Sequence, residues 1–165
     1  MQTAPTKTRD VIIAVDDDED DIDLMRLLFR KAGVSQPIQV FRRGEELVAA
    51  LLQQLAKSVK DALPFLCFLD VKMPSMSGHD LLQWIRKERR LDSMSVVMLS
   101  SSEHPIDVKQ AAEGGAQCYL AKYPQPAVLR RVVQEAERLS MNGAATEWFG
   151  LPANLLLRWG LAGGG

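Results

Sequence analysis

Residues 11–21 read VIIAVDDDEDD, an unbroken apolar run followed directly by acidic residues. Four of the five residues in Val11–Val15 are β-branched, and an apolar run without alternation is typical of a strand that is buried on both faces. The acidic block leads into a helical pattern in which Ile22, Met25 and Phe29 share one face. The stretch therefore predicts a parallel strand whose carboxyl end delivers carboxylates to the start of a helix.

Strand-like runs and helical patterns alternate through the rest of the chain to about residue 140. We expect further strands at residues 37–41, 65–69, 95–99 and 118–120, and further helices around residues 47–55, 81–85, 106–113 and 128–139. Such alternation implies a parallel sheet with helices on both faces, and right-handed crossovers leave few topologies open. We expect one α/β domain over residues 10–140, followed by an apolar C-terminal extension over residues 141–165 that is partly disordered at its end.

The composition excludes several classes of function. The chain has 165 residues, 47% of them hydrophobic and 25% charged, with a formal net charge of −1. This balance gives no general attraction to nucleic acid or anionic lipid, and no apolar run reaches the ~18 residues of a membrane span. The N-terminus, MQTAPTKTRD, has no apolar stretch that would mark a signal peptide. We expect a cytoplasmic protein without nucleic-acid or membrane partners.

Polar side chains stand where four of the predicted strands end. Asp16 and Asp17 follow the first strand, Asp70 follows the third, Ser100 follows the fourth, and Lys122 lies just beyond the fifth. Ligands of open parallel sheets bind at the carboxyl ends of the strands. We therefore expect three carboxylates, a hydroxyl and an ammonium group to meet at one edge of the sheet.

This set of groups predicts a phosphoryl acceptor that uses Mg²⁺ as its cofactor. Three neighbouring carboxylates repel one another unless a cation lies between them, and hard oxygen ligands suit Mg²⁺, which also binds phosphate oxygens. A carboxylate beside the metal can attack phosphorus and form an acyl phosphate. Lys122 can then pair with the added negative charge, and the hydroxyl of Ser100 can donate a hydrogen bond to it.

The motifs that carry this chemistry resemble those of the receiver domain of two-component response regulators. They are VDD at residues 15–17, LDVKMP at residues 69–74 with Gly78, the Ser100 position, and YLAK at residues 119–122. Each piece is short, but their order and spacing across the strand ends are specific. The resemblance implies a flavodoxin-like doubly wound fold, with a five-stranded parallel sheet in the order 2-1-3-4-5 and five helices.

The resemblance also implies a role for each site residue. Asp70 corresponds to the phosphorylated aspartate, and Lys122 corresponds to the lysine that contacts the phosphoryl group. The implied metal ligands are Asp16, Asp17, Asp70 and the backbone carbonyl of Lys72. Within the acidic pair, Asp17 is favoured as the direct ligand.

Ser100 and Tyr119 occupy the positions of the family's switch residues. In that family, the phosphoryl group draws the hydroxyl residue inward, the aromatic ring moves, and the surface around the fourth helix, fifth strand and fifth helix changes. The chain departs from the family at Lys122-Tyr123-Pro124, because the family has proline directly after the lysine, often through a cis peptide bond. The sequence leaves open whether the Lys122–Tyr123 bond is cis.

The resemblance implies a single-domain response regulator in a phosphorelay, not an enzyme, with a sensor histidine kinase as its partner. A looser similarity to receivers of phytochrome-type kinases lies in the long connection before residue 65 and in the aromatic residues after residue 140. It suggests a photoreceptor kinase as the partner, and a homodimer. The apolar tail at residues 148–159 either folds back on its own domain or extends an oligomer surface, and we favour the second.

Two other functions compete with this interpretation. A phosphatase of the haloacid dehalogenase type also uses an aspartyl nucleophile and Mg²⁺, and Asp16 and Asp18 have its spacing. However, Asp20 stands where that motif has Thr or Val, and the chain leaves no room for a cap domain. A degenerate receiver that acts only as a scaffold is disfavoured by the full set of acidic residues. For Asp18–Asp23, the preference of helix N-termini for negative charge is a sufficient explanation.

Overall fold

The computed structural model describes residues 10–57, 63–102 and 104–141. Within them, five strands form one parallel sheet in the order β2-β1-β3-β4-β5. The strands are β1 (Ile12–Val15), β2 (Ile38–Phe41), β3 (Leu66–Asp70), β4 (Ser95–Ser100) and β5 (Cys118–Ala121). The predicted flavodoxin-like fold and its strand order are thus confirmed. The predicted C-terminal extension beyond Met141 lies outside the described residues.

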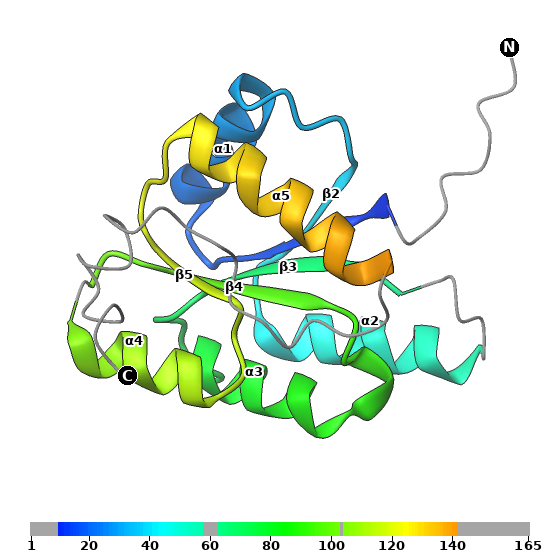
Figure 1. Ribbon diagram of the computed structural model, residues 1–165. Coiled ribbons are helices and arrows are strands. Elements are labelled where there is room, and N and C mark those ends of the chain that lie inside the picture. The colour runs from blue at the N-terminus through cyan, green and yellow to red at the C-terminus, as the bar shows by residue number, and fades with distance from the viewer. Residues whose placement is uncertain (1–9, 58–62, 103, 142–165) are drawn as a thin grey trace, which may run out of the picture.

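Five α-helices connect and cover these strands in the described part of the chain. They are α1 (Glu19–Lys31), α2 (Gly44–Ala56), α3 (Gly78–Lys87), α4 (Pro105–Glu113) and α5 (Pro126–Met141), with a short 3-10 helix, η3 (Arg89–Leu91), after α3. Figure 1 shows α1 and α5 on one face of the sheet and α2, α3 and α4 on the other. None of the helices described is long and apolar enough to cross a membrane.

The two helical layers bury opposite faces of the same strands. In β3, Leu66 and Phe68 pack in the cluster that contains the apolar faces of α1 and α5. The alternate residues Cys67 and Leu69 pack in the cluster that contains α2, α3 and α4. Every residue of β3 is buried. A strand covered on both faces needs apolar side chains at successive positions, which explains the unbroken apolar runs in the sequence.

The order of the strands creates a topological switch point between β1 and β3. The helix that follows β1 lies on one face of the sheet, whereas the helix that follows β3 lies on the other. The loops at the carboxyl ends of these adjacent strands therefore diverge, and such a topological switch point is the usual ligand site of open α/β sheets. Asp16 begins one of these loops, and Asp70 begins the other.

Capping residues start the helices immediately after these loops. Asp18 is the N-cap of α1, and its side chain accepts a hydrogen bond from the backbone N–H of Asp21. Ser77 caps α3 in a reciprocal arrangement with Asp80. Each such cap contributes about 1 kcal/mol of helix stability. The caps fix where α1 and α3 begin, and so they hold the loops at the switch point short.

Candidate functional site

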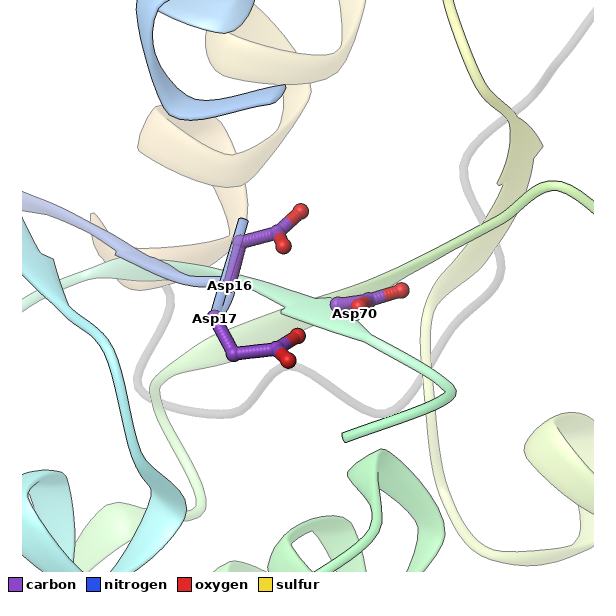
Figure 2. Close-up of side chains that lie close together, drawn as sticks. All are labelled: Asp16, Asp17 and Asp70. Carbon is purple, nitrogen blue, oxygen red and sulfur yellow. The ribbon is translucent and has the colours of Figure 1, made fainter. Parts of the chain in front are cut away.

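Three carboxylates meet at the carboxyl ends of β1 and β3. Asp16, Asp17 and Asp70 each offer an oxygen within 4.8 Å of the oxygens offered by the other two. Figure 2 shows their side chains extending in the same general direction from the two strand ends. Asp16 is 6% exposed and Asp70 is 7% exposed, whereas Asp17 is open to solvent. The structure thus brings together the acidic residues that were predicted from the strand ends.

Burial makes this arrangement electrostatically costly without a cation. Burial, together with the nearby charge of Asp16, raises the pKa of Asp70 to about 6, against the opposing effect of Lys122. Burial also raises the pKa of Asp16. A divalent cation between the three carboxylates would remove this repulsion, and an all-oxygen donor set suits Mg²⁺. The residues present therefore fit the predicted cofactor.

The raised pKa of Asp70 predicts that the metal-free protein loses stability as the pH rises from about 4 to about 7. Within this window, the folded protein holds a proton that the unfolded chain, with a carboxyl pKa of 3.8, has released. At neutral pH the shift costs about 2–3 kcal/mol of unfolding free energy. Asp70→Asn removes the titrating group, so urea unfolding in EDTA should show equal stabilities near about pH 4 and a variant that is more stable by ~2 kcal/mol at about pH 7. A difference that stays constant with pH would contradict this assignment.

Lys122 contacts two members of this carboxylate cluster, Asp16 and Asp70, and a third carboxylate, Asp21. Its Nζ is 2.8 Å from Asp16 Oδ2, 2.7 Å from Asp21 Oδ2 and 3.3 Å from Asp70 Oδ1. The lysine side chain is only 8% exposed. Burial alone would lower its pKa, but the hydrogen bonds to Asp16 and Asp21 and the charge of Asp70 raise the pKa above its ordinary value. The ammonium group therefore stays protonated and touches Asp70.

The alternation of side chains along the strands explains why these groups meet. Ile12, Phe68 and Leu120 all contact the layer formed by α1 and α5. Residues two or four positions further along a strand return to the same face. Asp16, Asp70 and Lys122 lie at such positions, at or one residue beyond the ends of β1, β3 and β5, so they lie beside the first turn of α1. This places Lys122 within reach of Asp21, which is 101 residues away in sequence.

Ser100 and Tyr119 belong to the opposite face and are linked through Ser102. The backbone N–H of Ser102 donates to Ser100 Oγ at 2.9 Å, and the Tyr119 hydroxyl donates to the Ser102 carbonyl at 2.9 Å. The Ser102 hydroxyl also donates to Asp107 in α4 at 2.8 Å. The ring of Tyr119 is buried, at 1% exposure. The two predicted switch residues thus share one hydrogen-bonded neighbour, which sequence reasoning gave no role.

Lys72 lies in the loop that follows Asp70, with its side chain exposed. Its backbone N–H hydrogen-bonds to the Asp70 carboxylate and favours the ionised form of that group. The structure places the Lys72 backbone next to the Asp70 carboxylate, as a ligand role for the Lys72 carbonyl would require. That role remains a prediction.

Sequence reasoning missed two further members of the site. Asp21 was explained by the helix N-terminus alone, yet its carboxylate binds the Lys122 ammonium and also accepts a hydrogen bond from the Tyr123 hydroxyl. Burial would raise the pKa of Asp21, but these two hydrogen bonds hold it below its ordinary value. The bond to Asp21 also raises the pKa of Tyr123 to about 12. The Lys122–Tyr123 peptide, which the sequence left open, is cis.

Comparisons with known proteins agree with this fold. A profile of the response regulator receiver domain matches residues 12–134. The profile covers most of the chain, and the chain belongs to the response regulator receiver family, with a sheet order that agrees with this assignment. The resemblance to receiver domains that was predicted from the sequence motifs is therefore confirmed. Members of this family act in two-component signalling, which sets the general class of function.

Similar proteins include other response regulators, two of which are named for phytochromes. Response regulator Rcp1 of Synechocystis sp. is 28% identical over 127 residues, covering 77% of this chain and 86% of Rcp1. The structure of the phosphorylated cyanobacterial phytochrome response regulator RcpA is similar with a TM-score of 0.62 at 26% identity, covering 82% of this chain and 96% of RcpA. The bacteriophytochrome response regulator RtBRR also gives a TM-score of 0.62 at 26% identity, with coverages of 86% and 82%.

Proposed function

We propose that this protein accepts a phosphoryl group on Asp70 from a histidine kinase, in a site that binds Mg²⁺. The metal ligands would be Asp16, Asp17, Asp70 and the backbone carbonyl of Lys72. The observation that carries the proposal is the cluster of Asp16, Asp17 and Asp70, in which Asp16 and Asp70 both pair with the protonated Lys122. Family membership supports it, because receivers act in phosphorelay signalling.

The geometry supports transfer from a phosphohistidine to Asp70. A carboxylate oxygen of Asp70 attacks the phosphorus atom, a new P–O bond forms, the P–N bond breaks, and the departing imidazole takes up a proton. When bound, Mg²⁺ would neutralise negative charge on the phosphoryl oxygens. Lys122 is already protonated, and its contact with Asp70 is the longest of its three carboxylate contacts. It would therefore exchange this partner for a phosphoryl oxygen.

The hydrogen bonds of Ser102 could transmit a structural change from Asp70 to the protein surface. We propose that Ser100 turns its hydroxyl toward a phosphoryl oxygen on Asp70 and so changes its bond to Ser102. Ser102 holds both the Tyr119 hydroxyl and Asp107 of α4. A shift there would alter the surface formed by α4, β5 and α5. This surface would carry the signal to a protein partner.

Several wider features of the proposal rest on the resemblance to phytochrome-associated receivers. We propose a single-domain receiver spanning residues 10–140, working in the cytoplasm as a homodimer. Its partner would be a sensor histidine kinase of the phytochrome type, with no nucleic-acid or membrane partner. The names of two similar structures, the phytochrome response regulator RcpA and the bacteriophytochrome response regulator RtBRR, support this choice of kinase.

The structure disfavours the phosphatase interpretation. That interpretation needs Asp16 as a free aspartyl nucleophile and a free Asp18 carboxylate beside it for proton transfer. Instead, Asp18 caps α1 by accepting a hydrogen bond from the backbone of Asp21. Asp16 pairs with Lys122. We therefore propose a signalling acceptor with no turnover of aryl phosphates.

Beryllofluoride, which mimics a phosphoryl group on a carboxylate, tests the proposal directly. We expect isothermal titration calorimetry to show binding of one beryllofluoride per protein chain in the presence of Mg²⁺, and at least about 100-fold weaker binding in EDTA. A turnover assay with an aryl phosphate, run in parallel, should show no hydrolysis above background. Absence of metal-dependent beryllofluoride binding would refute the proposal, and steady hydrolysis would favour the phosphatase.

A further inference from the structure

The carboxylate of Asp21 contacts the site lysine from outside the metal cluster. Its Oδ2 lies 2.7 Å from Lys122 Nζ, the shortest of the three ion-pair distances that this ammonium makes. Its Oδ1 accepts a hydrogen bond from the Tyr123 hydroxyl. The Asp21 side chain is 18% exposed. One carboxylate of α1 thus binds two consecutive residues that follow β5.

The other two partners of Lys122 have further roles in the site. Asp16 and Asp70 belong to the group of carboxylates that lie close enough to share an ion, and Asp21 does not. In the proposed function, the Asp16 carboxylate binds a cation, and Asp70 becomes an acyl phosphate. Both partners therefore change their bonding during the reaction. Asp21 is the carboxylate partner of Lys122 whose chemistry stays the same throughout.

We propose that Asp21 is a positioning residue, which holds the Lys122 ammonium beside Asp70 while Asp16 and Asp70 exchange ligands. This inference rests on the proposed function. The hydroxyl of Tyr123 fixes the orientation of the Asp21 carboxylate, since it binds the oxygen that the lysine does not use. An ammonium held in this way donates to a phosphoryl oxygen without first losing side-chain freedom, and such preorganisation speeds transfer.

A purely local role for Asp21 makes a different prediction. Asp21 lies in the acidic first turn of α1, where negative charge stabilises a helix. Asp20 occupies the same turn and is exposed. Replacing either residue with Ala removes one negative charge from this turn, so Asp20→Ala is a matched control for the effect on the helix. A role limited to the helix would give both variants the same phenotype.

The main test measures phosphoryl incorporation from acetyl phosphate at saturating Mg²⁺. We expect Asp21→Ala to label about 10-fold more slowly than the wild type, and Asp20→Ala to stay within about twofold of it. In a Lys122→Ala background, Asp21→Ala should cause no further loss, because Asp21 acts through the lysine. Equal rates in Asp21→Ala and the wild type, or an equal loss in both backgrounds, would overturn the proposal.

A second measurement needs neither metal nor phosphodonor. Lysine-selective labelling allows the exchange of the Lys122 ammonium protons with water to be followed by NMR in the metal-free protein. We expect faster exchange in Asp21→Ala, a smaller acceleration in Tyr123→Phe, and wild-type behaviour in Asp20→Ala. Unchanged exchange in Asp21→Ala would overturn the proposal. If the wild type fails to label at all, the proposed function fails, whereas this exchange measurement still decides whether Asp21 positions the lysine.

Discussion

Asp70→Asn is expected to abolish phosphoryl incorporation from acetyl phosphate, with a fall in rate of at least about 100-fold at saturating Mg²⁺. The amide has nearly the same shape as the carboxylate, so the variant should fold. However, a neutral amide is a poor nucleophile toward phosphorus, and it removes one of the three negative charges that would hold the cation. Intact-protein mass spectrometry after a timed reaction measures the modified fraction.

The matched control for this variant is Asp23→Asn. Asp23 is an exposed acid on α1 that pairs with Arg26, away from the carboxylate cluster. This control variant should label at the wild-type rate. Undiminished labelling of Asp70→Asn would show that another residue is the acceptor, and peptide mapping would then identify it. Labelling of the wild type that persists in EDTA would count against the metal role.

The main features of the fold were predictable from local patterns. Unbroken apolar runs such as VIIAV are required wherever a strand is covered on both faces, and the structure buries β3 and β4 completely. Helical spacing of apolar residues likewise marks the faces that meet the sheet. The strand order could not be predicted from local patterns, because periodicity does not fix which strands are neighbours. It came from the resemblance to receivers, whose motifs recur in order along the chain.

The candidate site was predictable only where a residue follows directly from a strand end. Asp16, Asp70 and Lys122 meet because parallel strands bring their carboxyl ends to one edge of the sheet. Asp21 was hidden in an acidic block that already had a sufficient explanation at the N-terminus of α1. Its partner lies 101 residues away. No local pattern reports a contact between a helix turn and a distant loop, and the role of Ser102 was missed for the same reason.

Gly78→Ala is expected to destabilise the protein by about 3 kcal/mol, at the upper end of the range for overpacked sites. A Cβ atom at Gly78 would lie 2.3 Å from the backbone carbonyl oxygen of Asp70 and 2.9 Å from Val71 Cα. Both obstacles belong to the backbone at the end of a buried strand, so neither can rotate away. The first turn of α3 would have to move off the sheet, although Leu81 is fully buried beneath it.

Gly44→Ala provides the matched control, since Gly44 is also a buried first residue of a helix. A Cβ atom there would meet the sulfur of Met76 at 2.9 Å, and a flexible methionine can adapt, so we expect a change of less than about 1 kcal/mol. Urea unfolding followed by circular dichroism would compare the two variants. Because the clash at Gly78 pushes on the carbonyl of Asp70, Gly78→Ala should also weaken beryllofluoride binding, whereas Gly44→Ala should leave it unchanged. Equal stability of the two variants would mean that the close approach of α3 to the end of β3 does not constrain the site.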